Sequence, residues 1–436
     1  MLTRFSKGAI AALFAIATLS SCTAPASQST SEPHSAQAST PNRNIRTEVL
    51  NPEPIRIDLA QLPQPNESNT ASKPPTVVPV PDNPILRVPV GFTVNVFAEG
   101  LDRPRWLTLA PNGDVLVTET RRNQITRLQH RDGAVFSRRP FATAENGLNL
   151  PFGMTFAGDS FYVANTDAVL RFPYANDRIS GRGEKIAELP GQGYNQHWTR
   201  NVVTSPDGQR LFVSIGSRSN ADEEPLPRAS VQVMNLDGSD RRTFASGLRN
   251  PVGLDFNPAT GALFATVNER DQLGDGLVPD YLTQVDENAF YGWPYAYLTP
   301  DRLDPRHVKE NGKSTRPDLA AKTRTPDVLF EAHSAALGLR FYTGNTFPEK
   351  YRNGAFVAFR GSWNRSSGTG YKLVFVPFSD GRPTGQYEDF LTGFLLDPKA
   401  PTTWGRPVGL LVLNDGSLIF TDEANNRIYR VQYTGK

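Results

Sequence analysis

The chain has 436 residues, enough for one large β domain or for two domains of ordinary size. Its 46 Lys and Arg residues against 44 Asp and Glu residues give a net charge of +2, and the absence of a basic excess argues against a nucleic-acid-binding protein. Hydrophobic residues make up 38% of the chain and Cys22 is its single cysteine, which together exclude an integral membrane protein, disulfides, zinc–thiolate sites and iron–sulfur clusters.

The first residues have the layout of an export signal. Two basic residues precede an apolar run at residues 9–17 that is too short to span a bilayer. Residues 19–22 (LSSC) resemble the bacterial lipobox, in which the cysteine becomes the lipidated first residue. We therefore expect a lipoprotein signal peptide over residues 1–21 and a lipid on Cys22, with an ordinary signal peptide as the alternative. The expected location is the bacterial cell envelope, with the folded domain in the periplasm or outside the cell and a lipid as its only membrane contact.

A proline-rich segment separates this signal from the rest of the chain. Residues 23–84 contain 12 prolines and no aromatic residue. Such a composition buries too little apolar surface to offset the entropy that is lost on ordering. We therefore expect residues 22–84 to form a disordered linker, rich in Pro, Ser and Thr, that tethers a folded domain at residues 85–436.

The folded domain consists of a repeated unit. Each unit has an apolar strand, a turn with glycine and a second apolar strand, and a third strand follows in most units. The turn glycines of the six units are Gly113, Gly158, Gly208, Gly261, Gly354 and Gly416. Most spacings are near the ~40–50 residues of a propeller blade, so the sequence predicts an all-β fold, a six-bladed β-propeller with four-stranded antiparallel blades. The largest spacing holds an insertion at about residues 295–327, and we expect residues 92–97 to supply the outer strand of the last blade.

The loops that lead into the blades of a propeller converge at one end of its central channel, so chemistry is expected there. His197 lies in the loop before the third unit, and a neutral imidazole is a suitable proton acceptor near physiological pH. Arg249 and Arg406 lie in the loops before the fourth and sixth units, and Arg360 follows a strand of the fifth. Guanidinium groups pair with carboxylates in a bidentate manner, so these arginines indicate a planar anionic ligand. The alternatives at this stage are a structural histidine and surface arginines.

The loop at residues 267–276 is rich in oxygen donors. It combines acidic and amide side chains with glycines, a composition that suits calcium. Its spacing does not match an EF-hand loop, so a solvated loop is an equally good interpretation of these residues alone.

Five stretches of the chain match the motifs of one known family. They are residues 249–254 (RNPVGL), 268–271 (NERD), 288–294 (NAFYGWP), 197–201 (HWTRN) and 333–339 (HSAALGL). Together they resemble the glucose/sorbosone dehydrogenase family, whose members are six-bladed propeller quinoproteins and include soluble aldose-sugar dehydrogenases. The last two stretches are similar to the sorbosone dehydrogenase branch in particular. The resemblance extends over about residues 88–435, the whole of the expected folded domain.

The resemblance implies pyrroloquinoline quinone (PQQ) and calcium as cofactors and assigns roles to individual residues. His197 is implied to be the general base that takes the hydroxyl proton of a sugar. The implied PQQ contacts are Asn149, Arg249, Asn250, Arg360 and Arg406. The implied calcium site consists of the main-chain carbonyls of Glu269 and Arg270, with Asp271 nearby, and His333 is implied to line the substrate side.

The chain departs from the best-known members of this family at two positions. Gln196 precedes the expected base where an aspartate is often found, so the group that orients the imidazole must come from elsewhere. Val408 replaces an arginine that is often found two positions beyond Arg406.

The function implied by the resemblance is oxidation of an aldose sugar or a sorbosone-like aldehyde to a lactone or acid, with hydride passing from its anomeric or aldehyde carbon to the quinone. Two other classes stay open, a calcium-dependent propeller lactonase that uses His197 and a non-catalytic envelope binding module. The sequence is compatible with a monomer or a dimer and does not specify the electron acceptor.

Overall fold

The computed structural model of the protein describes residues 44–191 and 197–435. In this part of the chain almost all regular structure is β-strand, which confirms the predicted all-β class. The helical elements are η1 (Leu59–Gln61), η2 (Thr120–Arg122), η3 (Ala144–Asn146), η4 (Pro305–His307), η5 (Glu349–Tyr351) and the single-turn α1 (Pro317–Ala320). Among the described residues no helix has the length and apolar character needed to cross a membrane. The expected signal peptide, Cys22 and Gln196 lie outside the described residues.

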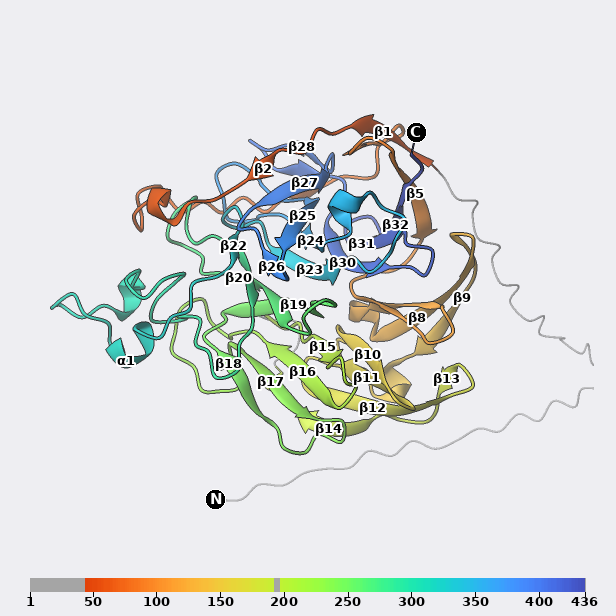
Figure 1. Ribbon diagram of the computed structural model, residues 1–436, viewed down its shortest axis with the longest axis horizontal. Helices are drawn as coiled ribbons and strands as arrows, with labels where there is room; N and C mark the ends of the chain where they lie inside the picture. The colour runs from red at the N-terminus through yellow and green to blue at the C-terminus, as the bar shows by residue number, and fades with distance from the viewer. Residues whose placement is uncertain (1–43, 192–196, 436) are drawn as a thin grey trace, which may run out of the picture. The chain divides into compact units, whose positions relative to one another are not determined.

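Six antiparallel sheets follow one another along the chain (Figure 1). The first is β6 (Leu107–Leu109), β7 (Val115–Glu119), β8 (Gln124–Arg131) and β9 (Ala134–Ala142). The second is β10 (Met154–Ala157), β11 (Ser160–Ala164), β12 (Ala168–Ala175) and β14 (Glu184–Glu188), with β13 (Arg178–Ile179) also paired to β12. The third is β15 (Val202–Thr204), β16 (Arg210–Ile215), β17 (Ser230–Asn235) and β18 (Arg242–Ser246).

The other three sheets have the same order of strands. The fourth is β19 (Asn250–Phe256), β20 (Leu263–Asn268), β21 (Tyr281–Gln284) and β22 (Val328–Leu329). The fifth is β23 (Ala336–Phe341), β24 (Gly354–Phe359), β25 (Lys372–Ser379) and β27 (Tyr387–Leu391), with β26 (Arg382–Pro383) paired to β25. The sixth is β30 (Pro407–Val412), β31 (Leu418–Asp422), β32 (Arg427–Tyr433) and β5 (Phe92–Glu99).

The first strands of the six sheets contact one another in a closed order. β6 contacts β10, and further contacts follow from β10 to β15, β19, β23, β30 and back to β6. This order is the one expected for a propeller, in which each sheet presents its first strand to a common centre (Figure 1). β5 pairs with β32, so the prediction that residues 92–97 supply the outer strand of the last sheet is confirmed.

Glycines in the first strands allow neighbouring sheets to approach closely. A Cβ atom on Gly338 would lie 2.2 Å from the carbonyl oxygen of Val408, and one on Gly409 would lie 2.2 Å from that of Arg105. Gly253 is in the same situation. A larger residue at these positions would push the first strands apart, because the atom that its Cβ would meet belongs to the main chain and cannot rotate away. These three first-strand glycines, which are distinct from the turn glycines of the repeat, are thus required at the centre of the fold.

An apolar cluster gathers one residue from the beginning of each sheet. Its members are Trp106, Phe152, Trp198, Val252, Leu337 and Val408. The rings of Trp106 and Phe152 lie 5.1 Å apart, and those of Phe152 and Trp198 lie 6.1 Å apart. Val408 is completely buried in this cluster, and an arginine in its place would bring a charge into apolar surroundings. We call these six residues the central cluster.

The prediction of a disordered linker is wrong from residue 44 onward. β1 (Asn44–Val49) pairs with β4 (Ile85–Val88) and with β5. β2 (Pro54–Ile55) pairs with β27. β3 (Thr76–Val77) pairs with β29 (Thr402–Thr403), which also pairs with β28 (Leu395–Asp397). We call residues 44–84 the arm. The arm adds its backbone to existing sheet edges, where main-chain hydrogen bonds compensate for the small number of large apolar side chains. Residues 22–43, including Cys22, lie outside the described residues.

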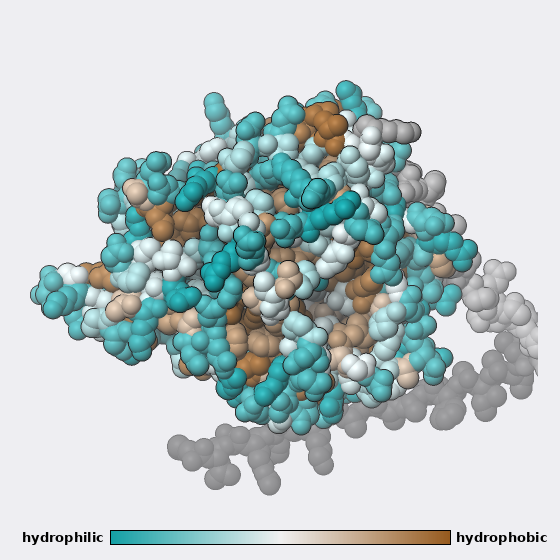
Figure 2. All heavy atoms as spheres, viewed as in Figure 1, coloured by the Kyte–Doolittle hydropathy of each residue, from teal (hydrophilic) through white to brown (hydrophobic). Residues whose placement is uncertain are grey.

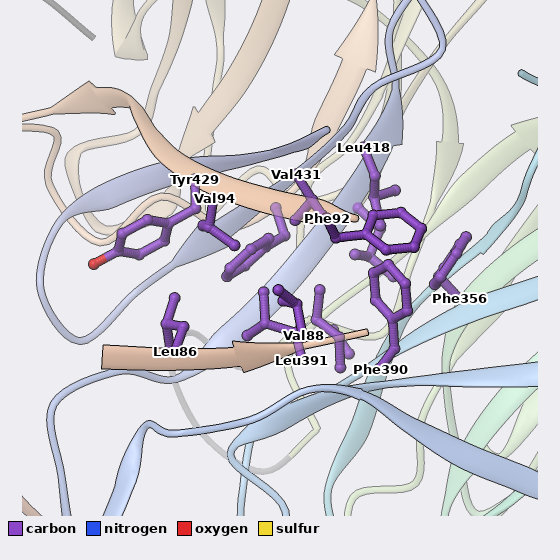
Figure 3. Close-up of a cluster of buried hydrophobic side chains, with 14 of the residues drawn as sticks. Leu86, Val88, Phe92, Val94, Phe356, Phe390, Leu391, Leu418, Tyr429 and Val431 are labelled. Carbon is purple, nitrogen blue, oxygen red and sulfur yellow. The ribbon is translucent and has the colours of Figure 1, made fainter. Parts of the chain in front are cut away.

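The arm and the last sheets share one hydrophobic core. Leu86 of β4 and Phe92 of β5 pack with Phe390 of β27 in a cluster of buried side chains (Figure 3). Ile45 of β1 belongs to the same cluster, and Val78 of the arm packs against it. The expected domain boundary at residue 85 therefore falls inside a single packed unit.

The insertion predicted at about residues 295–327 lies between β21 and β22. It carries η4 and α1, and Tyr295, Ala296 and Ala320 form a small apolar cluster within it. Hydrophilic residues cover most of the face seen in Figure 1, including the projecting part around α1, whereas hydrophobic residues are visible around its centre (Figure 2).

Candidate functional site

A cavity of about 240 Å³ lies at the entry to the first strands, and Trp198, Val252 and Leu337 of the central cluster are part of its lining. The residues expected in the site that line it are His197, Arg249, Asn250, Glu269, Asp271, His333 and Arg360. They come from loops and strand ends of the third, fourth and fifth sheets. The entry loops therefore meet around one space, as the repeat predicted.

Ser217, in the loop after β16, holds the imidazole of His197. Nδ1 of His197 lies 3.0 Å from the carbonyl oxygen of Ser217 and 2.9 Å from its hydroxyl oxygen. Because a carbonyl oxygen only accepts hydrogen bonds, Nδ1 carries the proton and Nε2 keeps its lone pair. No described residue donates a hydrogen bond to Nε2. The ring nitrogen that a proton acceptor requires is therefore available.

The surroundings of His197 keep its imidazole neutral. Its pKa is lowered to about 3, mainly because the ring is desolvated and also because the positive charge of Arg249 is near, whereas Asp271 acts in the opposite direction. The backbone of His197 has φ of 32°, in a region that non-glycine residues seldom adopt and that is concentrated at functional sites. A neutral imidazole at physiological pH is the form that a general base needs.

Arg249 is almost completely buried and is fixed by several acceptors. Its Nη2 donates to the carboxylate of Asp271 at 2.8 Å and to the side-chain oxygen of Asn220 at 2.9 Å. Its Nε donates to the carbonyl of Asn220 at 3.0 Å, and its Nη1 donates to the carbonyl of Glu269 at 2.5 Å. Burial alone would raise the pKa of Asp271, but Arg249 together with His333 and His197 outweighs it and the pKa is lowered. Arg249 thus presents a rigid positive charge beside the cavity.

Arg105 and Arg360 also line the cavity, and both pair with Glu423. Each guanidinium contacts a different oxygen of this buried carboxylate. Burial would raise the pKa of Glu423, but the two arginines outweigh it and the pKa is lowered, so the carboxylate is ionised. Two guanidinium groups on one carboxylate leave a net positive charge at this part of the cavity.

Three of the expected site residues do not line the cavity. The guanidinium of Arg406 donates to main-chain carbonyls of the loop after β24 and so supports the lining from behind. Asn149 is exposed and its amide donates to Asp167 at 2.8 Å. The guanidinium of Arg270 pairs with the buried Asp304. Asn149 and Arg406 are thus absent from the lining of this cavity, and their contacts with a cofactor stay predictions.

Two buried oxygen atoms of cavity-lining residues accept no hydrogen bond from the described residues. They are Oδ1 of Asn250 and Oε1 of Glu269. Burial raises the pKa of Glu269 to about 8. It also raises the pKa of Asp280, whose carboxylate accepts the amide proton of Glu269 at 2.9 Å, to about 6. Buried acceptors without donors are positions where a bound ligand or ion completes the bonding.

The expected calcium ligands are present only in part. The carbonyl of Glu269 accepts from Arg249, and the carbonyl of Arg270 accepts from the amide of Val278 at 3.3 Å. In the described ranges no group of three or more His, Cys, Asp or Glu side chains lies close enough together to hold a metal ion. The unsatisfied Oε1 of Glu269 is an oxygen donor of the kind that calcium takes. Calcium would therefore need ligands beyond the side chains of this loop, such as an oxygen of a bound cofactor.

His333 belongs to a hydrogen-bonded group that joins two loops of the cavity. Its Nε2 lies 3.0 Å from the carbonyl of Gly274 and donates to it. The side-chain amide of Asn364 lies 3.1 Å from Nδ1 of His333 and donates at 2.7 Å to Asp271. Burial would lower the pKa of His333, but the carboxylate of Asp271, the carbonyl of Gly274 and the carboxylate of Asp280 together outweigh it and the pKa is raised.

Several lining and supporting residues were not identified from the sequence. They are Arg105, Asn268, Asp280, Trp363 and Asn364 in the lining, with Ser217 and Glu423 behind it. A signal for one of them, Glu423, exists in the repeat, because Glu423 follows directly after the second strand of its sheet, as the expected residues Glu269 and Arg360 do. Only Arg360 was recognised in this way.

A family model now identifies the chain. The model of the TrAA12-like family matches residues 86–434. The chain belongs to the TrAA12-like family. This protein of the TrAA12-like family is 30% identical over 366 residues to an uncharacterized protein of Borreliella burgdorferi. The aligned region covers 80% of this chain and 91% of the relative.

Two more distant relatives carry names. A pyrroloquinoline quinone-dependent pyranose dehydrogenase of Coprinopsis cinerea is 24% identical, over 77% of this chain and 53% of the relative, so the TrAA12-like chain spans about half of that enzyme. A pyrroloquinoline quinone-dependent sugar dehydrogenase of Hypocrea jecorina is 23% identical, over 78% of this chain and 88% of the relative. The resemblance to quinoprotein sugar dehydrogenases that the motifs indicated is confirmed.

Solved structures share the fold of the TrAA12-like chain. The holo form of the PQQ domain of the Coprinopsis cinerea pyranose dehydrogenase has a TM-score of 0.67 at 22% identity, covering 81% of this chain and 98% of that domain. A calcium structure of a Trichoderma reesei family AA12 enzyme has a TM-score of 0.67 at 18% identity. The match covers 88% of this chain and 100% of that enzyme's chain. At these identities the likeness establishes the fold alone.

Proposed function

We propose that the protein is a PQQ-dependent sugar dehydrogenase built on a six-bladed β-propeller. It oxidises an aldose or a sorbosone-like aldehyde at the anomeric or aldehyde carbon, and the product is a lactone or an acid. The observation that carries the proposal is the meeting of one neutral imidazole, His197, with three guanidinium groups around a single cavity. The named relatives and the closed order of the six sheets support it.

The residues of the cavity fit a planar cofactor that carries several carboxylates. Arg105, Arg249 and Arg360 place three guanidinium charges beside the space for those carboxylates and for the reactive carbonyl edge. The N–H groups of Arg249 are bound within the protein, so Arg249 would stabilise negative charge that develops there through its fixed positive charge. Asn250 lines the same space with an unsatisfied side-chain oxygen. When bound, PQQ supplies a quinone that accepts two electrons from the substrate.

Glu269 is the residue best suited to hold calcium in this site. Its Oε1 is buried and without a donor, and calcium binding would keep this carboxylate ionised where burial alone favours its protonation. Asp271 lines the same cavity, although Arg249 already neutralises much of its charge. We propose these two side chains, with oxygen atoms of the cofactor, as the calcium ligands of the loaded enzyme.

His197 acts as the general base of the reaction. Nε2 takes the proton of the substrate hydroxyl group while Nδ1 stays bound to Ser217, so the ring keeps its orientation as its charge changes. Trp198, Val252 and Leu337 form an apolar part of the lining, which limits the access of water to the reacting carbon.

The location of the enzyme follows from its first residues. We propose that residues 1–21 are a lipoprotein signal peptide and that Cys22 carries the lipid that attaches the enzyme to the cell envelope. Mass spectrometry of the protein purified from membranes is expected to find a lipid-modified Cys22 at the N-terminus. An unmodified chain in the soluble extracellular fraction would support the ordinary signal peptide instead.

The proposed activity is tested by reconstitution. The full chain is titrated with PQQ and calcium, and reduction of an artificial dye is followed after addition of an aldose. We expect cofactor binding and dye reduction, loss of dye reduction with cofactor binding retained in His197→Ala, and no effect in His130→Ala, which does not line the cavity. If the chain fails to bind PQQ at micromolar concentration but hydrolyses a lactone in the presence of calcium, the lactonase is the better assignment. If it neither binds PQQ nor hydrolyses a lactone, the binding module is favoured.

A further inference from the structure

The arm contacts two loops of the candidate site. The first loop follows β20 and includes Gly274, whose carbonyl accepts a hydrogen bond from His333. The second follows β24 and includes Trp363 and Asn364, both of which line the cavity. We propose that residues 66–73 of the arm form a clamp that positions these two loops for substrate binding.

The clamp binds the first loop through its backbone and one hydroxyl group. The amide of Asn66 donates to the carbonyl of Leu273 at 2.9 Å, and the hydroxyl of Ser68 accepts the amide proton of Asp275 at 2.8 Å. Ser68 also packs so closely on Gly274 that a Cβ atom there would lie 2.7 Å from the Ser68 hydroxyl oxygen. The arm therefore fixes the residue that orients His333.

The clamp binds the second loop through Lys73. The amide of Lys73 donates to the carbonyl of Trp363 at 2.7 Å, and its Nζ donates to the carbonyl of Ser366 at 2.9 Å. Lys73 is thus bound at both ends to the stretch that carries Trp363 and Asn364 into the lining of the cavity.

The two loops are also joined to each other where the clamp holds them. The amide of Ser366 donates to the carboxylate of Asp275 at 3.0 Å, and its hydroxyl contacts the same carboxylate. Asp275 and Ser366 are the residues that Ser68 and Lys73 bind, so the arm closes a ring of contacts. A change in the arm is therefore transmitted to both loops together.

Trp363 is the residue most directly affected by the clamp. Its side chain is 46% exposed although it lines the cavity, so it lies at the mouth. A half-exposed indole offers an apolar surface to a ligand that enters. Because Lys73 fixes the backbone of Trp363, the clamp determines the position of the indole at the cavity mouth. Ser68 and Lys73 are positioning residues and do not themselves line the cavity.

The clamp is tested first without turnover. Ser68→Ala removes the acceptor of the Asp275 amide proton, and Lys73→Met removes the ammonium group but keeps most of the aliphatic side chain. Ser72→Ala changes an exposed neighbour and is the matched control. Lys73→Arg tests whether a conservative replacement restores the contact. Hydrogen exchange of the full chain is expected to be faster at residues 273–276 and 363–366 in the first two variants and unchanged in the controls. Acrylamide quenching of tryptophan fluorescence is expected to rise in the same two variants, because Trp363 is the most exposed of the five tryptophans: Trp106, Trp293 and Trp404 are buried and Trp198 is half-buried. Exchange and quenching equal to the wild type would overturn the clamp.

The consequence for substrate binding rests on the proposed function and is measured separately. In the PQQ-loaded enzyme we expect Ser68→Ala and Lys73→Met each to raise KM for the sugar about fivefold, the change expected for one lost hydrogen bond, with kcat and the thermal midpoint close to the wild type. An unchanged KM in variants with faster exchange would overturn the positioning role. If the wild type shows no dehydrogenase activity, the proposed function fails, and exchange and quenching still decide whether the clamp exists.

Discussion

His197 is held by the carbonyl and the hydroxyl of Ser217, at 3.0 Å and 2.9 Å from Nδ1, and by no carboxylate of the described residues. This contact supplies the orienting group that the replacement of an aspartate by Gln196 left open. It also means that no negative charge bonds directly to the imidazole, so desolvation and Arg249 dominate its pKa.

Ser217→Ala is expected to reduce kcat about three- to tenfold, because one of the two acceptors of Nδ1 is lost while the carbonyl remains. The effect is measured as dye reduction at saturating sugar in the PQQ-loaded enzyme. Cofactor affinity is expected to stay within about twofold, since Ser217 does not line the cavity. The exposed Ser239→Ala is the control. Loss of cofactor binding in Ser217→Ala with unchanged kcat would contradict the orienting role.

The depressed pKa of His197 predicts a specific dependence of stability on pH. The pKa is about 3 in the folded chain and 6.5 in a free histidine, so the folded state binds this proton less readily than the unfolded state. Above pH 6.5 the group is neutral in both states and stability is unaffected. As the pH falls from 6.5 towards 3, only the unfolded state becomes protonated, and stability is lost.

Urea unfolding of the wild type and of His197→Gln at several pH values between 7 and 4 measures this effect. We expect the free energy of unfolding of the wild type to fall more steeply with acid than that of His197→Gln, because other titrating groups are common to both proteins. Parallel curves for the two proteins would show that the imidazole is not held neutral by its surroundings.

Sequence reasoning found the repeat and the entry loops because both leave local signals. A turn between two apolar strands requires glycine, and the close approach of first strands at Gly338 and Gly409 requires it again, so the period is visible in the printed sequence. His197 and Arg249 could be placed at one site because the repeat assigns them to equivalent loops.

The sequence could not show which partners neutralise or orient these residues. Glu423 meets Arg105 and Arg360 across a gap of more than sixty residues, and nothing local to Glu423 marks this pairing. The arm was misjudged for a related reason, since its order depends on the edges of sheets that are formed by distant strands such as β27 and β29. The composition of a segment indicates whether the segment can form a hydrophobic core by itself. It does not indicate whether the segment becomes ordered by packing against a core that other parts of the chain form.

Glu423→Gln is expected to lower both stability and cofactor affinity. The substitution removes the carboxylate charge that Arg105 and Arg360 share, and breaking a buried ion pair typically costs about 3–5 kcal/mol. Both guanidinium groups are expected to shift once this charge is lost, so PQQ affinity measured by fluorescence titration is expected to fall as well. The exposed Glu145→Gln is the control, and a variant as stable as the wild type would show that the two arginines do not depend on Glu423.

Gly409→Ala tests the packing at the centre of the fold. The added Cβ would lie 2.2 Å from the carbonyl of Arg105, which lies just before the first strand β6, and β30 and β6 cannot separate without disturbing the neighbouring sheets. We expect a loss of about 3 kcal/mol or more in urea unfolding, with weaker PQQ binding because Arg105 lines the cavity. Gly208→Ala is the comparison, since Gly208 has positive φ but open space around it and its replacement is expected to cost only about 1–2 kcal/mol. Equal losses in the two variants would mean that backbone conformation alone, and not the close approach of β30 to the strand entry at Arg105, selects glycine at this position.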